Sequence, residues 1–400
     1  MPDVKAPLRR IRGRANRLGR RVAELREPVV LPSRPPMPDT PVRLLVGPAN
    51  FAGQGWAWAR AAEDAAPGVT AQAFAVLNDR IDFDADYAVP RETFLSPRWQ
   101  RQQRTYVTRA YTHVLIEAAR PVLGARDPWG DRCTGDLPIL RSAGLRVAMV
   151  SHGSDVRVPS DHIDRYPWSP FTDLPAARLR SLQINSTANR DLMRAHDGPV
   201  YVSTPDLLDD LPDAAWLPVI VDVGRWATGL PVMARDRPVV AHAPSNSPMK
   251  GSDLVDPVVR ALADRGVVEY RRVEGVSPAD MPAVYQDADV VLDQFRLGSY
   301  GVAACEAMAA GRVVVGHVTE EVRARVREYT GRELPIVEST PETLEQVLRA
   351  LVADRDAAAK HAAAGADFAA EIHDGRRSAS VLAAFVGTVP EPAGSAPRRA

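Results

Sequence analysis

Short apolar runs alternate with helical segments along this chain, and this alternation most constrains how the chain can fold. The first series has apolar runs at Val42–Val46, His113–Glu117, Val147–Val150 and Val200–Ser203. Neighbouring strands of a parallel sheet all begin at the same edge, so the chain must cross back between them, usually as a helix. Strands that alternate with helices therefore favour a parallel sheet. The first series therefore predicts one α/β domain.

A second series follows three spaced prolines, Pro218, Pro231 and Pro238. It predicts strands at Val239–Ala243, Val268–Val273, Val290–Leu292 and Val313–Val315, and helices at Leu254–Arg265, Ala279–Asp287 and Val302–Ala310. Two series predict two Rossmann-like, doubly wound domains that face a central cleft, where such sheets bind ligands. We expect domains at 38–216 and 238–365, a linker at 217–237, a C-terminal helix at 366–387 and a disordered tail at 388–400.

Composition excludes several other classes of protein. The 400 residues are 45% hydrophobic and 25% charged, which is the balance of a folded globular protein. The formal net charge is zero, so nucleic acid is not an expected partner. Cys133 and Cys305 lack the spacing of a disulfide framework or a zinc site. No run reaches the roughly 20 apolar residues of a membrane span, so we expect a cytoplasmic protein.

The first 37 residues form a separate segment. Apolar residues recur at spacings of three and four over residues 5–27, which predicts a helix with one apolar face and many arginines on the other. A proline-rich linker follows. Such a helix can lie on an anionic membrane surface at the inner face, or it can dock on the protein or on a partner. The sequence favours neither alternative.

The most informative segment is VVLDQFRLGSYGVAACEAMAAGRVVVG at Val290–Gly316. A strand leads through a glycine-containing turn into a helix, and helix N-termini bind phosphate through free N–H groups. The segment resembles the donor-binding segment of the family 4 retaining glycosyltransferases, which have the two-domain GT-B fold. The resemblance implies that Glu306 accepts hydrogen bonds from the ribose hydroxyls of a nucleotide-sugar donor. It also places the nucleotide sugar on the second domain and the acceptor on the first.

Two further segments match the same family. In AHAPSNSPMKG at Ala241–Gly251, the resemblance makes Lys250 a cation for the donor diphosphate. The family usually has an arginine a few residues earlier, which this loop lacks. In VAMVSHGSDVR, His152 directly follows a strand and resembles the histidine that hydrogen-bonds the donor sugar. Lys250, Glu306 and His152 are therefore the candidate catalytic residues.

The remaining candidate residues are backbone positions that approach the donor. The loop GPANFAGQG resembles the family's first glycine loop, and the segment around Gly275 lies where the family binds the base. At Gly298 the sequence departs from the family, because many members have a glutamate there that binds the donor sugar. The candidate donor-binding residues besides Lys250 and Glu306 are Gly53, Gly55, Asn246, Gly275, Gly298, Ser299, Tyr300, Gly301 and Val302.

The resemblance implies transfer of a sugar with retention from a nucleotide-sugar donor to a glycan, lipid-linked or small-molecule acceptor. We expect no cofactor besides this substrate. Asp82-Phe83-Asp84 matches a metal-binding Asp-x-Asp pattern, but we interpret it as a surface turn and expect no required metal. Two alternatives remain open: a nucleotide-sugar epimerase of the same fold, and a sugar-nucleotide-binding protein without catalysis.

Overall fold

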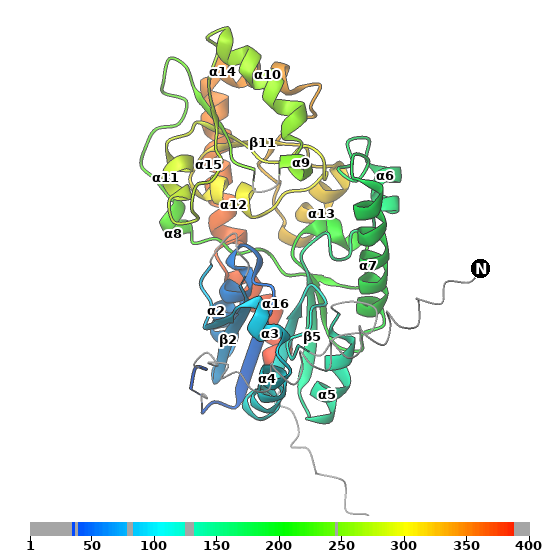
Figure 1. Cartoon of the computed structure of the whole chain (residues 1–400). Coiled ribbons are helices and arrows are strands. Elements are labelled where there is room, and N and C mark those ends of the chain that lie inside the picture. Colours follow the sequence, from blue (N-terminus) through cyan, green and yellow to red (C-terminus); the bar gives the residue numbers. More distant parts are fainter. Residues whose placement is uncertain (1–33, 37–38, 78–82, 125–131, 245–246, 388–400) are drawn as a thin grey trace, which may run out of the picture.

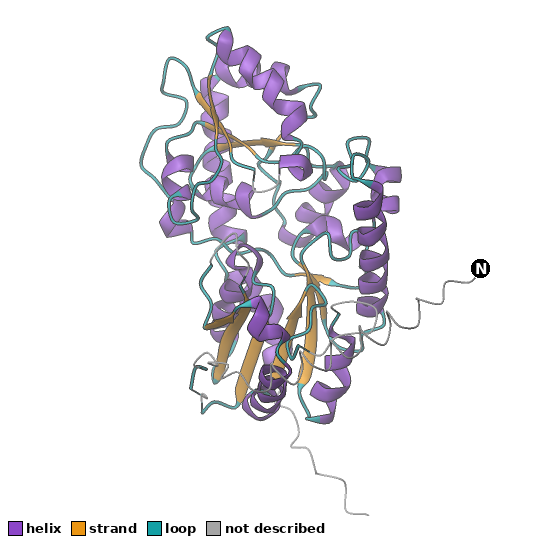
Figure 2. Ribbon diagram, in the orientation of Figure 1, coloured by secondary structure: helices purple, strands orange, loops and turns teal. Residues whose placement is uncertain are grey.

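The structure is a computed structural model that describes residues 34–36, 39–77, 83–124, 132–244 and 247–387. The helix predicted at 5–27, the tail at 388–400 and Asn246 lie outside the described residues, so these expectations stay predictions. The described chain forms two sheets with helices packed around them (Figure 2).

The N-terminal domain is built on a seven-stranded sheet in which every pair of neighbouring strands is parallel. Its order is β3-β2-β1-β4-β5-β6-β7. The strands are β1 (Val42–Gly47), β2 (Val69–Val76), β3 (Tyr87–Val89), β4 (His113–Glu117), β5 (Arg146–Ser151), β6 (Val200–Val202) and β7 (Ala215–Trp216). The central strands β1 and β4 are buried at nearly every position, which explains why Val, Leu and Ile make up most of their residues.

The C-terminal domain is built on a five-stranded parallel sheet with the order β12-β11-β10-β8-β9. Its strands are β8 (Val239–His242), β9 (Glu269–Arg272), β10 (Val290–Leu292), β11 (Val313–Gly316) and β12 (Val337–Glu338). The fold class expected from the two series of strands is confirmed, because both sheets are parallel and both are covered by helices.

Helices connect the strands and cover both sheets (Figure 1). The N-terminal domain has α2 (Gln54–Ala65), α3 (Arg91–Leu95), α4 (Pro97–Ala110), α5 (Asp136–Ser142), α6 (Pro159–Arg165) and α7 (Ala176–Arg194). Short 3-10 helices lie at Phe51–Gly53, Cys133–Gly135 and Pro205–Asp209. The later helices are α8 (Val223–Trp226), α9 (Ser247–Lys250), α10 (Ser252–Asp264), α11 (Met281–Gln286), α12 (Val302–Ala309), α13 (Glu320–Thr330), α14 (Leu344–Ala353), α15 (Arg355–Ile372) and α16 (Arg376–Val386).

The Ala-rich end of the chain forms two helices that belong to different domains. Helix α15 packs on α12 and β11, whereas α16 crosses back and packs on α2 of the N-terminal domain (Figure 1). The break between them lies at His373, whose Nδ1 hydrogen-bonds the carbonyl oxygen of Val219 at 2.8 Å. Burial lowers the pKa of His373 to about 4, so it stays neutral at this crossing. The last helix therefore ties the two domains together.

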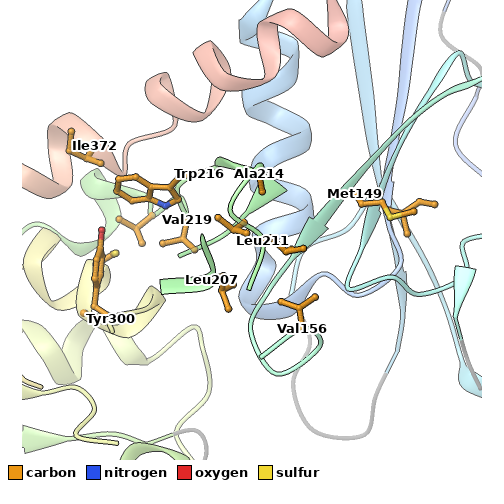
Figure 3. Close-up of a cluster of buried hydrophobic side chains, with 14 of the residues drawn as sticks. Met149, Val156, Leu207, Leu211, Ala214, Trp216, Val219, Tyr300 and Ile372 are labelled. Atoms are coloured by element: carbon orange, nitrogen blue, oxygen red, sulfur yellow. The ribbon is translucent and has the colours of Figure 1, made fainter. Parts of the chain in front are cut away.

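One hydrophobic cluster continues from one domain into the other. Tyr300 and Ile372 lie near Trp216 and Val219 in the buried cluster of Figure 3, and all four side chains are almost fully buried. Polar contacts add to this interface, because the hydroxyl of Ser299 donates to Asp206 at 2.6 Å. The domains are therefore packed closely on each other beside the cavity described below.

Candidate active site

Both sheets place their functional side chains at the point where the strand order reverses. In the N-terminal sheet β1 lies between β2 and β4, and in the C-terminal sheet β8 lies between β9 and β10. Loops that leave two such neighbouring strands go to opposite faces of the sheet and leave a crevice at the carboxyl ends. Glu117 ends β4, and Asp293 directly follows β10, so a carboxylate lies at each of these points.

The N-terminal crevice is organised around Glu117, which is fully buried. Its Oε2 accepts hydrogen bonds from the backbone N–H groups of Ala49 at 2.9 Å and Asn50 at 2.8 Å. Its Oε1 lies 3.0 Å from Nε2 of His152. One carboxylate therefore joins the loop after β1 to the loop after β5, across the end of β4.

The glycine loop after β1 is shaped to admit this carboxylate. Asn50 has a left-handed backbone (φ 44°), and its Oδ1 accepts a hydrogen bond from the N–H of Trp56 at 3.0 Å. Gly53 also has a positive φ of 72°, which glycine adopts without strain. The two glycines predicted to approach a donor therefore shape the loop: Gly53 by its φ, and Gly55 by leaving room for Glu117.

His152 is held from several sides. Its ring packs edge-on against Phe51, with ring centroids 5.1 Å apart, and lies 5.2 Å from the ring of Trp58. Its backbone N–H donates to Oδ1 of Asp155 at 3.0 Å, which fixes the start of the loop after β5. The imidazole is therefore ordered before any substrate binds.

The C-terminal crevice contains a group of charges. Lys250 Nζ donates to Oδ1 of the buried Asp293 at 2.5 Å, joining the segments that follow β8 and β10. Burial raises the pKa of Glu306 to about 8, while the positive charges of Lys250 and Arg225 act in the opposite direction. Glu306 accepts no hydrogen bond from any residue that the structure describes. Its carboxyl group is thus available to a ligand.

Between the two domains lies a cavity of about 880 Å³. This volume suits a nucleotide-sized ligand. Two positions at the start of α12, Gly301 and Val302, contribute the wall from the C-terminal domain. Val219 of the linker lies beside the N-terminal domain, which contributes Phe51, Ala52, Gln54, Ala118, Arg120, Arg132, His152, Ser154, Asp155, Ser181, Leu182, Asn185, Asn189, Ser203 and Thr204.

The structure brings some of the predicted residues to this cavity. His152, Gly301 and Val302 line it, and Glu306 lies one helical turn beyond Val302 on the same face of α12. The backbone N–H groups of Val302 and Ala303 donate to no acceptor among the described residues, as expected at a helix N-terminus. Lys250 is coupled to Glu306 electrostatically and does not itself line the cavity.

Other predicted residues have different surroundings. The side chains of Ser299 and Tyr300 are buried in contacts with Asp206 and His373, respectively, between the domains. Gly298 has a φ of 66° and lies against Tyr166 and Thr319. Gly275 has a φ of 71° in the open turn between β9 and α11, and it is not among the residues that line the cavity.

Sequence reasoning missed three charged residues of the site. They are Glu117 at the end of a predicted strand, Asp293 directly after another, and Arg225 in the predicted linker. A polar residue directly after an apolar strand was the available signal for Asp293. Glu117 gave a similar signal, because an acid ending the run HVLI is expected to have a partner. Arg225 gave no signal, because only the folded chain places α8 against α12.

No metal centre is visible in the part of the chain that the structure covers. No group of three or more His, Cys, Asp or Glu side chains is arranged to hold an ion among these residues. Asp82 lies outside them, and the backbone oxygen of Asp84 accepts a hydrogen bond from Asn50 at 2.9 Å. Likewise, no described helix combines the length and apolar character that a bilayer crossing needs.

Comparison with solved structures places this architecture among known folds. Sucrose-phosphate synthase from Thermosynechococcus elongatus superposes with a TM-score of 0.54 at 13% identity, over 86% of this chain and 97% of that one. Anabaena HepE in complex with UDP gives 0.52 at 11% identity, covering 86% and 99%. WaaG, a glycosyltransferase involved in lipopolysaccharide biosynthesis, gives 0.51 at 12% identity with the same coverage. No protein-family model and no curated protein sequence matches the chain. The chain therefore has the two-domain GT-B fold.

Proposed function

We propose that this chain is a glycosyltransferase that moves a sugar from a nucleotide-sugar donor to a hydroxyl group of an acceptor. The observation that carries the proposal is the cavity between the domains, which is bounded by His152 on one side and by the N-terminus of α12 on the other. The glycosyltransferase WaaG and a sucrose-phosphate synthase share the fold, and HepE was solved with UDP and with UDP-glucose.

The donor diphosphate would bind at the start of α12. The N–H groups of Val302 and Ala303 and the positive end of the helix dipole favour an anion there. Lys250 would supply positive charge, and Arg225 would replace the arginine that the loop before Lys250 lacks. Glu306, one turn further along, would accept hydrogen bonds from the ribose hydroxyls, as the family resemblance implies.

The opposite wall of the cavity suits an acceptor rich in hydroxyl groups. Ser181, Asn185 and Asn189 lie four residues apart on α7, so they share the face that lines the cavity. Oδ1 of Asn189 and Oδ2 of Asp155 are buried and have no hydrogen-bond partner among the residues that the structure describes. Both atoms accept hydrogen bonds, so they favour a ligand that donates, such as the hydroxyls of a glycan, of a lipid-linked sugar or of a small polyol.

We propose transfer with retention, on the resemblance of Val290–Gly316 to a retaining family. The bond between the anomeric carbon and the diphosphate oxygen breaks, and a bond to the acceptor oxygen forms on the same face of the sugar. The acceptor proton moves to the departing diphosphate oxygen. Lys250 and the N–H groups of α12 stabilise the charge that develops on the diphosphate.

A donor screen followed by a transfer assay tests this function. Uridine, guanosine, adenosine and thymidine diphosphates are first compared by thermal shift, because a ligand at a hundred times its Kd stabilises by roughly 2.7 kcal/mol. The matching nucleotide sugars are then incubated with and without simple sugar acceptors. Release of nucleoside diphosphate that depends on an acceptor supports transfer, and NMR of the product reports the anomeric configuration. Conversion of the donor alone to an epimer would instead identify an epimerase. Binding of the donor without turnover on any acceptor would support a protein that only binds.

A further inference from the structure

The two oxygens of the Glu117 carboxylate have separate partners. Oε2 accepts from the backbone N–H groups of Ala49 and Asn50, and Oε1 faces Nε2 of His152. The carboxylate is fully buried, and the N–H groups of Ala49 and Asn50 both need the acceptor that its oxygen supplies. An ionised carboxylate only accepts hydrogen bonds, so Nε2 of His152 carries the proton of this contact.

This contact determines what His152 presents to a substrate. A neutral imidazole with a proton on Nε2 has an unprotonated Nδ1, which accepts a hydrogen bond. No described residue bonds to Nδ1, and His152 lines the cavity between the domains. The histidine is thus prepared to accept a hydrogen bond from a ligand hydroxyl.

We propose that Glu117 is a positioning residue that fixes His152 in the tautomer with Nε2 protonated, so that Nδ1 accepts a hydrogen bond from a hydroxyl of the substrate. This inference rests on the proposed function for the identity of the substrate. The tautomer itself follows from the contacts of Glu117 and is measurable without any turnover. The opposite tautomer would present an N–H group, which suits an acceptor atom and not a hydroxyl donor.

A purely structural role for Glu117 would be to anchor the loop after β1. Substitution by glutamine separates this role from the proposed one. The two N–H groups at Ala49 and Asn50 require an oxygen, so the amide oxygen of glutamine takes the place of Oε2. Its NH₂ group then faces Nε2 of His152 and donates to it. Glu117→Gln therefore keeps the loop anchor and reverses the tautomer.

The experiment compares the full-length wild type with Glu117→Gln by ¹⁵N NMR of the histidine rings. The His152 signals are identified by their loss in His152→Ala. We expect Nε2 to be the protonated nitrogen in the wild type and Nδ1 to be protonated in Glu117→Gln, with the two proteins melting within a few degrees of each other. The same tautomer in both proteins would overturn the inference.

Kinetics supply the second part of the test. We expect Glu117→Gln to lower kcat/KM by about ten- to a hundredfold, the range known for carboxylates that orient metal-bound histidines. In a His152→Ala background the same substitution should change nothing further, because Glu117 acts through His152. An equal loss in both backgrounds would show that Glu117 only anchors the loop. A reversed tautomer in a protein without glycosyl transfer would leave the tautomer assignment standing and refute the proposed function alone.

Discussion

The carboxylate of Glu117 lies where a side chain on Gly55 would have to begin. A Cβ atom at residue 55 would lie 2.9 Å from Oε2, closer than Cβ atoms are found to other atoms, and a tight 3.1 Å from Oε1. Gly55 lies in the first turn of α2, where glycine is otherwise unfavourable. The glycine is therefore explained by the approach of the carboxylate that orients His152, and not by a turn.

Gly55→Ala tests this relationship. Alanine favours a helix by about 1 kcal/mol over glycine, so helix propensity alone predicts stabilisation. The contact with Glu117 opposes this gain, and we expect turnover to fall at least tenfold as the carboxylate moves away from His152. Gly229→Ala is the control, because a Cβ there lies within 4 Å of no atom in the described part of the chain. Unchanged kinetics for Gly55→Ala would refute the explanation.

We expect donor binding to depend on pH because the pKa of Glu306 is raised. Burial raises its pKa to about 8 in the free protein. Ribose hydroxyls that donate to the carboxylate favour its ionised form and so lower this pKa when the donor binds. The affinity for the nucleotide should then be highest above about pH 8. Below that value it should fall by up to tenfold for each pH unit. Titration of the nucleotide by calorimetry between pH 6 and 9 measures this slope.

Glu306→Gln is the control for this pH dependence of affinity, and its melting temperature gives a second measurement. It should weaken donor use by about ten- to a hundredfold at pH 9, and remove the pH dependence. The folded pKa of Glu306 lies above its unfolded value, so the wild type loses stability as the pH rises from about 4.5 to 8. Glutamine avoids this loss, because its amide does not ionise. The variant should therefore melt above the wild type at pH 8 and close to it at pH 5.

Lys250 and Asp293 form an ion pair, and we expect substitutions of the two residues to have opposite effects on donor binding. Lys250→Ala should weaken donor use about ten- to a hundredfold, because it removes a charge that would bind the diphosphate. Asp293→Asn leaves the lysine in place and removes the carboxylate that competes with the diphosphate for it. We expect tighter binding of nucleoside diphosphate to this variant. If both substitutions weaken binding equally, the pair is structural and Lys250 does not reach the donor.

The sequence was sufficient for the fold because its central strands are continuous apolar runs. Segments such as HVLIE and VVL are buried on both faces of a parallel sheet, and that environment requires their composition. Strand β2 has the sequence VTAQAFAV, whose alanines and glutamine have weak strand propensity, and it was not predicted. The short edge strands β3, β7 and β12 were also missed, because two or three residues carry too little pattern.

The candidate site was predictable only where one segment contains the whole signal. Glu306 and the start of α12 belong to one continuous motif, so the sequence alone is enough to locate the N-terminus of this helix. The contact of Glu117 with His152 joins residues 35 positions apart. The effect of Arg225 on Glu306 depends on how the linker packs on α12. Such contacts follow from tertiary packing, which local sequence does not encode.

The basic helix at residues 5–27 remains a prediction. Its apolar stripe would enter the membrane interface while its arginines meet anionic headgroups, each adding about 1 kcal/mol. We expect the full chain to sediment with vesicles that contain phosphatidylserine, and a chain that begins at Pro38 to stay in solution. Neutral vesicles are the control, because they should bind neither form. Equal sedimentation of both forms with anionic vesicles would contradict the prediction.

Gly298 is the position where this chain departs from the family that it resembles, and its surroundings predict the result of restoring the glutamate. The residue has a φ of 66°, and a Cβ there would lie 2.8 Å from Cγ2 of Thr319 and 3.0 Å from Cε1 of Tyr166. Any side chain is therefore strained, whatever its charge. We expect Gly298→Glu and Gly298→Ala both to lower the melting temperature and the activity with the native donor. Repulsion between the new carboxylate and the diphosphate should make the glutamate variant the less active of the two. A severalfold rise in turnover for Gly298→Glu would show instead that a catalytic group has been lost here, and would favour a protein that binds sugar nucleotides without transferring the sugar.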